Sequence, residues 1–337
     1  MKYDFYGELE WDPSNQSLGM RYPGGELVPV SNGDHQLFVD GTNGSDLNNG
    51  LSWSQAFKTI QMAIDSAKPN YKVFVKAQTI PGTVTDPVSY AENLIIPATC
   101  SGLQIIGMGG PNRTQGGMPQ LKTSVAGAAV TILIIRAAGV LIYGMGINGA
   151  GNTAGGILLD DDGTAKEAFG TAIINCHFKN CVGSTATDGR TGGAIMWTAA
   201  GNAWQVLIKG NRFYKNVADV VLKGTSNSVP QDVVIEDNIF SGPTASVDVN
   251  LWLAGGSGMN GVVVRNNVFP SVLPSLSSGS IVRYVDMTGC VGIFSGNTVG
   301  GVYTTTGFGV AKAAAKIPLT VGIAKNYSDS GLIVREA

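Results

Sequence analysis

Two aspartates occupy equivalent places in two similar apolar segments, and their spacing suits carbohydrate chemistry. Asp219 opens the segment DVVLK, and Asp248 opens DVNLW at an interval of 29 (248 − 219) along the chain. If these segments are neighbouring parallel strands, the two carboxylates lie roughly 5 Å apart on one face of the sheet. Retaining glycosidases hold their catalytic carboxylates at about 5 Å. Outward aspartates at strand starts are also common without any activity, so a structural role is the alternative.

A second acidic cluster and one glycine-rich loop are candidates for a bound cation. The cluster consists of Asp160, Asp161 and Asp162, for which calcium binding and simple solvation are competing interpretations. The loop VDGTNGSD, residues 39–46, looks like a calcium loop but lacks the distal glutamate of an EF-hand. We interpret the loop as a structural turn, and we expect no metal and no cofactor.

Histidine and cysteine offer little further chemistry. Histidine occurs only at His35 and His177, and neither lies in a nucleophile motif. His177 is interpreted as a turn residue. Together with Cys176 and Cys181 it makes three potential ligands, one short of a structural zinc set.

The ends of one series of expected strands alternate aromatic and charged residues. The outward positions are Asp160, Trp197, Lys223, Trp252 and, with one residue of slip, Arg283 or Tyr284. Stacked strands would set these side chains in one lengthwise stripe. Aromatic and polar groups together suit sugar rings, and the same residue types are typical of subunit interfaces. The stripe therefore predicts either a polysaccharide groove or the contact face of a homotrimer.

The element that must position these residues is an internal repeat. Each copy carries one asparagine at the same place, and the five are Asn211, Asn238, Asn267, Asn297 and Asn326. Their numbers rise in near-constant steps, and an irregular copy, TAIINCHF, puts Asn175 somewhat more than one step before the first of them. Such a repeat is typical of a solenoid whose coils stack on one another. We expect an interior ladder of asparagine side chains at one bend of each coil.

Each repeat contains two strands. In the segment before each asparagine, apolar residues such as Val233 and Ile235 alternate with polar ones such as Glu236, which indicates a strand buried on one face. Further apolar segments, GGILLD, GGAIMW, DVVLK, DVNLW and SIVRY, supply a second strand. Phe213, Phe240 and Phe269 are expected to stack beside the ladder. The pattern predicts an all-β fold, a right-handed parallel β-helix, with loops between the coils.

The segment LFVDGTNGSDLNNGLSWSQAFKTIQMAIDSA, residues 37–67, resembles the opening of pectate-lyase-like right-handed β-helix proteins, including many phage tailspikes and fibres. The match lies in a short strand, a loop rich in glycine and asparagine, Trp53 and the run AFKTI. Apolar residues at helical spacing follow, and Ser52 or Ser54 is expected to cap that helix. We expect residues 37–70 to form a strand and a short α-helix that covers the open end of the stack.

Composition narrows the class of partner. The formal net charge is −2, with 22 basic and 24 acidic residues and no dense basic run, so a nucleic-acid partner is not expected. No apolar stretch is long enough for a transmembrane helix, and no secretion signal is visible, so a membrane partner is not expected either. The 4 cysteines are too scattered for a disulfide framework and indicate reduced thiols of a cytoplasmically made protein.

Residues 1–36 lack the repeat and combine aromatic residues with prolines, which suggests an extended arm. We consider two alternative roles for this arm: it attaches to other virion proteins, or it packs back along the rod. Residues 71–337 are expected to be β-helix coils. With the resemblance, this organisation predicts a phage virion structural protein of the spike or fibre type, a homotrimer that contacts host-surface polysaccharide. A polysaccharide-cleaving glycosidase or lyase on the same rod, and a capsid decoration or vertex fibre, remain the alternatives.

Overall fold

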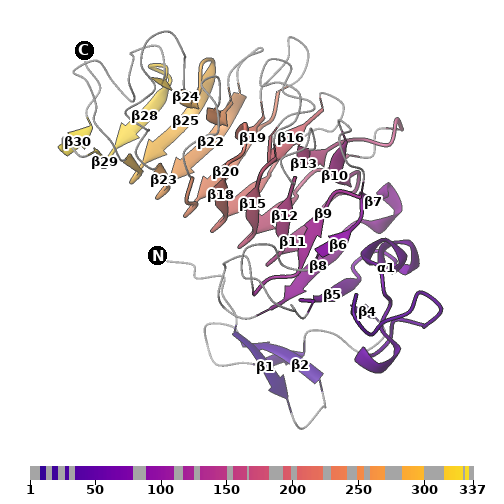
Figure 1. Cartoon of the computed structure of the whole chain (residues 1–337). Helices are drawn as coiled ribbons and strands as arrows, with labels where there is room; N and C mark the ends of the chain where they lie inside the picture. The colour runs from indigo at the N-terminus through magenta and orange to yellow at the C-terminus, as the bar shows by residue number, and fades with distance from the viewer. Residues whose placement is uncertain are drawn as a thin grey trace.

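The computed structural model describes residues 8–12, 17–21, 27–29, 35–78, 89–109, 117–124, 130–149, 155–164, 167–181, 193–198, 203–222, 229–240, 249–253, 259–269, 283–299, 315–328 and 331–333. Within these residues the chain winds into coils, and equivalent strands of successive coils pair in parallel along a rod (Figure 1). The fold is a right-handed parallel β-helix, as the repeat predicts. Among these residues, no helix has the length and apolar character needed to cross a bilayer.

One face of the rod is a ten-stranded parallel sheet. Its strands are β4 Gln36–Val39, β5 Lys72–Lys76, β8 Gln104–Met108, β11 Leu141–Tyr143, β14 Ala172–Ile174, β17 Leu207–Lys209, β20 Val234–Glu236, β22 Met259–Arg265, β25 Cys290–Ser295 and β28 Val321–Ala324. A second face is an eight-stranded parallel sheet. It contains β7 Leu94–Ile96, β10 Thr131–Ile135, β13 Gly155–Leu159, β16 Ile195–Trp197, β19 Ala218–Val221, β21 Val249–Trp252, β24 Arg283–Asp286 and β27 Ala315–Lys316.

The third face is built from two shorter sheets in line. A five-stranded sheet contains β6 Ser89–Ala91, β9 Gln120–Lys122, β12 Gly146–Asn148, β15 His177–Lys179 and β18 Arg212–Tyr214. A four-stranded sheet continues with β23 Val268–Phe269, β26 Thr298–Val299, β29 Asn326–Ser328 and β30 Gly331–Ile333. Ile239 joins the two sheets through single bridges to Arg212 and Val268.

The space between the three faces is filled by apolar side chains stacked in columns along the rod. On the ten-stranded sheet, Ile173, Ile208 and Ile235 are in register and have no exposed surface. Phenylalanines form another column, and Phe178, Phe213, Phe240 and Phe269 stack with ring centroids 5.1, 4.9 and 4.8 Å apart. The apolar residues of the repeat therefore form one continuous core.

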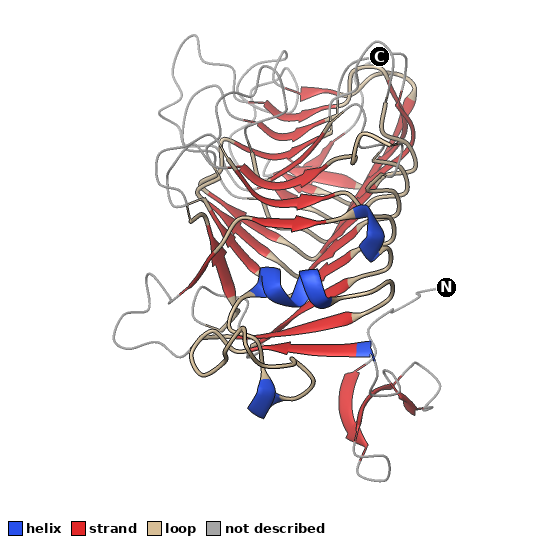
Figure 2. Cartoon of the chain, turned by 90° about the vertical axis from the view of Figure 1, so that its right-hand side faces the viewer, coloured by secondary structure: helices blue, strands red, loops and turns tan. Residues whose placement is uncertain are grey.

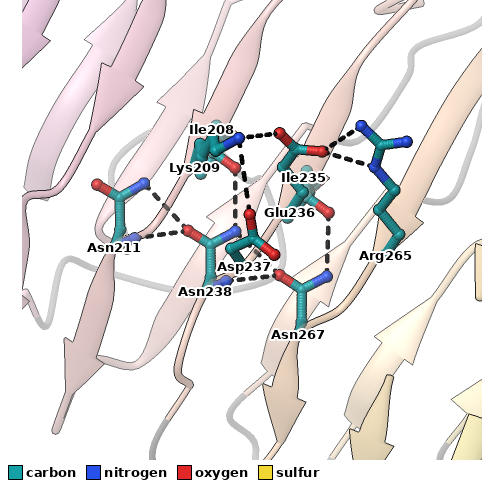
Figure 3. Close-up of polar contacts among 9 residues, drawn as sticks. All are labelled: Ile208, Lys209, Asn211, Ile235, Glu236, Asp237, Asn238, Arg265 and Asn267. Carbon is teal, nitrogen blue, oxygen red and sulfur yellow. Dashed lines mark hydrogen bonds and ion pairs between the residues drawn. The ribbon is translucent and has the colours of Figure 1, made fainter. Parts of the chain in front are cut away.

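The asparagine ladder lies at the bend between the ten-stranded sheet and the third face (Figure 3). Its members, all with 0% exposure, are Asn211, Asn238, Asn267, Asn297 and Asn326. Asn238 shows the pattern: its Nδ2 donates to the carbonyl of Ile208 and to Oδ1 of Asn267, both at 3.0 Å. Its Oδ1 accepts from the backbone N–H of Asn211 at 2.9 Å. Each amide thus satisfies backbone groups that the bend would otherwise leave buried and unpaired.

The residue before each ladder position adopts a left-handed conformation. These residues, with φ between 53° and 68°, are Gly144, Asn175, Gly210, Asp237, Asn266, Gly296 and Lys325. Asn175 is therefore the equivalent of Gly210, and Cys176 holds the ladder position, with its N–H donating to Oδ1 of Asn211 at 2.8 Å. The interpretation of Asn175 as an earlier ladder copy is wrong by one residue, because asparagine also tolerates the left-handed conformation.

A short helix lies across the first coils (Figure 2). Helix α1 Ile60–Ser66 packs Ile60, Ala63 and Ile64 against the core. Its N-cap is Thr59, whose side chain accepts from the N–H of Met62, and Glu92 accepts from the first two N–H groups of the helix. The expected Ser52 or Ser54 cap is wrong, because Phe57 is extended and pairs with β4, so that helix formation begins later. Two 3₁₀ helices, Trp53–Gln55 and Ala98–Cys100, lie before and after helix α1 along the chain.

Within residues 1–36, the described segments form more than an extended arm. Strand β2 Ser17–Arg21 pairs antiparallel with β1 Glu8–Asp12 on one side and with β3 Leu27–Pro29 on the other. Figure 1 draws β1 and β2 at the end of the rod that carries β4. The attachment role of this region stays a prediction.

Candidate functional site

The outer face of the eight-stranded sheet holds most of the residues that the sequence singles out. One column of side chains on this sheet is in register and points into the core; it consists of Ile157, Ile195, Val220, Leu251 and Val285. Since side chains alternate along a strand, described residues that flank these positions point outward, apart from Ala194, which belongs to the core. A first outward row contains Gly156, Asp219 and Asn250, and a second contains Leu158, Met196, Val221, Trp252 and Asp286.

The expected stripe of Asp160, Trp197, Lys223, Trp252 and Tyr284 does not form. Trp197 pairs with Leu159, is 3% exposed and belongs to the core. Trp252 pairs with Val221 on one side and with Asp286, not Tyr284, on the other. Asp160 follows its strand and lies beside Thr198, and Lys223 lies outside the described residues, as does the side chain of Tyr284. A slip of one residue moves a side chain to the other face of a sheet, which explains the error at Trp197.

The expected pair of Asp219 and Asp248 falls partly outside the described residues. Strand register places Asn250 opposite Asp219, and Asp248 lies outside the described residues. Asp219 is 3% exposed, and its two carboxylate oxygens accept from Nδ2 of Asn216 at 2.9 Å and from Nδ2 of Asn250 at 2.6 Å. Asn216 also accepts from the N–H of Cys181, so Asp219 belongs to a buried network that holds the turn before β19.

The acidic cluster at 160–162 is divided among three different contacts. Asp160 accepts from Nε of Arg136 at 3.1 Å and from the hydroxyl of Thr198 at 2.9 Å. Asp161 forms a single antiparallel bridge with Glu167, and Asp162 accepts from the N–H of Thr164 at 2.8 Å. Each of these contacts stabilises the local backbone or an ion pair, which favours the structural interpretation of the cluster.

In the calcium-like loop, residues 39–46, the carboxylates also have structural hydrogen-bond partners. Asp40 accepts from the N–H groups of Thr42 and Asn43 and from Nζ of Lys76 at 2.7 Å. Burial alone would raise the pKa of Asp40, but these bonds hold it below its usual value. Asp46 accepts from the N–H groups of Lys58 and Thr59, both at 2.9 Å. The two carboxylates tie the loop to the first coil, and within the described residues no cluster of three or more histidine, cysteine or acidic residues has metal-binding geometry.

His177 lies in a strand and not in a turn. It opens β15 on the outer face of the five-stranded sheet, between Gly146 and Arg212. Burial, with the nearby charges of Lys179 and Arg212, lowers the pKa of His177 to about 4. Its imidazole is therefore neutral at pH 7 and a weak base. Burial likewise raises the pKa of the Cys176 and Cys181 thiols to about 12, which makes both unreactive.

Sequence reasoning missed an ion-pair cluster on the outer face of the ten-stranded sheet (Figure 3). Glu236 lies between Lys209 and Arg265 on adjacent strands, with Nζ of Lys209 at 2.8 Å and Nε of Arg265 at 2.6 Å from its carboxylate oxygens. The Glu236 side chain is 8% exposed although it points away from the core. The signal was present in the repeat, because these three residues hold equivalent positions in consecutive copies and alternate in charge.

Replacing Glu236 with glutamine is expected to lower the free energy of unfolding by about 1–2 kcal/mol at pH 7, a value discounted for the exposure of Arg265. Burial alone would raise the pKa of Glu236, but Lys209 and Arg265 lower it below 4.5. Its stabilising contribution is therefore full above pH 4.5 and disappears as the pH falls through the folded value. Denaturant titrations of both proteins at neutral and strongly acid pH measure the difference.

The matched control for this prediction is Asp237→Asn. Asp237 is 44% exposed and lies 3.6 Å from Lys209, so its replacement is expected to cost less than about 0.5 kcal/mol. A Glu236→Gln difference that stays constant from neutral to acid pH would contradict the ionic origin of the effect.

No protein-family model and no curated protein matches this sequence. Several solved structures have a similar backbone. A rhamnogalacturonan lyase is 13% identical over 88% of this chain and 88% of its own, with a TM-score of 0.43. A GH136 lacto-N-biosidase from Eubacterium ramulus is 11% identical over 89% of this chain and 68% of its own, with a TM-score of 0.44. A tailspike protein of E. coli bacteriophage HK620 is 11% identical over 97% of this chain and 60% of its own, with a TM-score of 0.38.

The likeness is one of fold. At these identities the similarity is limited to the β-helix backbone, and the chemistry of the surface must be argued from this chain's own residues. On the outer face of the eight-stranded sheet, those residues are a buried carboxylate network, one ion pair and an apolar group around Met196, Val221 and Trp252. Among the described residues, no two carboxylates face each other on adjacent strands there.

Proposed function

We propose that this chain is a structural rod of a phage virion, of the spike or fibre type, that assembles as a homotrimer and contacts host-surface polysaccharide. The virion assignment rests on the resemblance of residues 37–67 to the opening of such proteins. The trimer is supported by one structural observation, a row of exposed side chains along the third face. The polysaccharide contact is supported by the exposed aromatic side chains of Phe169 and Trp204.

This row, here called the outer ridge, runs parallel to the rod axis. It consists of Arg212, Ile239, Val268, Thr298 and Tyr327, which are consecutive partners across neighbouring strands. Ile239 is 42% exposed, Val268 40% and Tyr327 52%. The four steps of the ridge span roughly 19 Å at the usual strand spacing. Ile239 and Val268 are direct neighbours in this row, and adjacent exposed apolar side chains occur at interaction surfaces.

Identical rods are suitable partners for a ridge of this shape. In a closed trimer whose rods run parallel to the symmetry axis, a row that runs along the rod is parallel to the contacts between neighbouring copies. The stacked core and the asparagine ladder fix the spacing of the ridge side chains, which lowers the entropy cost of binding. Residues 1–36 are proposed to connect the rod to other virion proteins.

The competing function, a polysaccharide-cleaving enzyme, is favoured by one observation. Asp219, Asp286 and Trp252 lie on the same outer face of the eight-stranded sheet. Asp219 is held by two amides, however, and Asp286 accepts from the N–H and hydroxyl of Thr288. These bonds suit carboxylates with a structural role better than a free acid and base pair.

Light scattering on the purified chain tests the proposal, and a mass three times that of the monomer is expected. Replacing both Ile239 and Val268 with lysine is expected to give monomers, because each trimer contact would then bury several like charges. Leu47→Lys is the control, since Leu47 is 97% exposed and distant from the ridge in the fold. A monomeric wild-type protein, or a double variant that remains trimeric, would rule out this interface.

The same preparations, incubated with bacterial surface polysaccharides, separate the two functions. The structural proposal predicts binding without new reducing ends or unsaturated uronates, whereas turnover would establish the enzyme. Immunogold labelling of intact particles then distinguishes a tail spike from a capsid decoration or vertex fibre.

A further inference from the structure

Two exposed aromatic residues occupy the same place in successive coils, at the turn that leads into the ten-stranded sheet. Phe169 precedes the left-handed Gly170 and β14, and Trp204 precedes the left-handed Gln205 and β17. The backbone confirms the equivalence, because the N–H of Gly170 donates to the carbonyl of Trp204 at 2.9 Å. The two rings therefore project from points roughly 4.8 Å apart along the rod axis.

Both side chains are exposed at the surface, and the ring of Trp204 is also held in place. Phe169 and Trp204 are each 38% exposed. The indole N–H of Trp204 donates to the carbonyl of Val229 at 3.0 Å, which holds the ring in place. A surface ring that is both exposed and anchored is organised for stacking before any ligand arrives.

The two sides of this aromatic pair differ in a way that suits a sugar chain. Towards the N-terminal end, the turn positions are Gly102, Gly139 and Gly170, and a Cβ added at Gly170 would come no nearer than 3.9 Å to Gly139. This strip of bare backbone leaves room beside the rings. Towards the C-terminal end, the amide side chains of Gln205 and Gln231 follow, and Gln231 pairs directly with Trp204. Amides both donate to and accept from hydroxyl groups.

The charges on the same turns select among possible ligands. Asp161 and Glu167 bridge each other on the turn of Phe169, and Asp232 follows Gln231. These carboxylates disfavour uronates and other polyanions. They also disfavour a second copy of this turn, which would bring the same acids together.

We propose that Phe169 and Trp204 form a platform on which neutral pyranose units of a polysaccharide stack, with the chain running along the rod and Gln205 and Gln231 bonding its hydroxyls. This inference rests on the glycan-recognition part of the proposed function and names its site and sugar class. The platform lies at a turn, apart from both the outer ridge and the outer face of the eight-stranded sheet.

Calorimetric titration of the full chain with maltohexaose, mannohexaose, chitohexaose and hexagalacturonate tests the platform. At least one neutral hexasaccharide is expected to bind, and Phe169→Ala and Trp204→Ala are each expected to weaken its binding about tenfold. Trp204→Phe keeps an aromatic face and is expected to stay within about threefold of wild type. Tyr214→Ala is the matched control, because Tyr214 is 42% exposed on a different face.

Four other results would contradict part or all of this proposal. Unchanged binding in both alanine variants would overturn the platform while leaving glycan recognition intact. Wild-type protein that binds no saccharide would overturn both. Tighter binding of hexagalacturonate would overturn the neutral class, and a changed oligomeric mass in Trp204→Ala would make the pair a subunit contact. Phe169→Ala removes no hydrogen bond, so it carries the test if Trp204→Ala fails to fold.

Discussion

Replacing Asn238 with alanine is expected to lower the free energy of unfolding by about 2–6 kcal/mol, because two buried backbone groups lose their partners at roughly 1–3 kcal/mol each. Those groups are the N–H of Asn211, which donates to Oδ1 of Asn238, and the carbonyl of Ile208, which accepts from its Nδ2. Water cannot replace the amide, since Asn211 and Asn238 both have 0% exposure. Guanidinium denaturation followed by circular dichroism measures the loss.

The control lies one residue from the ladder, in the next coil. Asn266 is exposed, adopts φ 56° and precedes Asn267, while glycine holds its place in three other coils. Asn266→Gly keeps the left-handed turn available and is expected to change stability by less than about 0.5 kcal/mol. An Asn238→Ala loss as small as this would show that the ladder contributes little.

The ladder was predictable because the spacing of the ten-stranded sheet is regular. In the five coils of the ladder, one left-handed residue and then one asparagine follow the strand of this sheet, and successive asparagines are 27, 29, 30 and 29 residues apart. The alternation of apolar residues fixed which side of each strand faces the core, as at Ile208 and Ile235. A constant period in the sequence therefore became a column of side chains in space.

The eight-stranded sheet has no such regularity. Between paired positions its intervals along the chain are 25 (220 − 195), 31 (251 − 220) and 34 (285 − 251), because loops of different length join the strands. An average period of thirty cannot fix the register here, and a one-residue error reverses the face of every side chain. For this reason Asn250, and not a residue 29 positions further on, lies opposite Asp219, and Trp197 is a core residue.

Asparagine itself was ambiguous for a separate reason. In VVVRNNVF two asparagines are adjacent, and Asn266 takes the left-handed position while Asn267 enters the ladder. The sequence TAIINCHF has only the first of these, followed by Cys176. Asparagine fits the first position because it tolerates the left-handed conformation. It fits the second because its buried amide satisfies backbone groups. Residue type alone cannot separate them without the neighbouring coil.

Replacing Phe240 with alanine is expected to lower the free energy of unfolding by about 3–5 kcal/mol, since a fully buried aromatic ring leaves a cavity. Phe240 has 0% exposure and stacks between Phe213 at 4.9 Å and Phe269 at 4.8 Å, with interplanar angles of 12° and 11°. The backbone on either side is held by hydrogen bonds to adjacent coils, so the neighbouring rings cannot move in to fill the space. Denaturant unfolding measures the change.

A double-mutant cycle separates stacking from simple loss of volume. If the rings of Phe213 and Phe240 interact as a stack, the double alanine variant is expected to lose about 0.5–1.5 kcal/mol less than the sum of the two single losses. Tyr214→Ala is the control, because Tyr214 adjoins Phe213 on β18 but is 42% exposed on the opposite face. Additive single losses would mean that the column is held by burial alone. The regular spacing of its rings would then follow from the backbone and not from their mutual attraction.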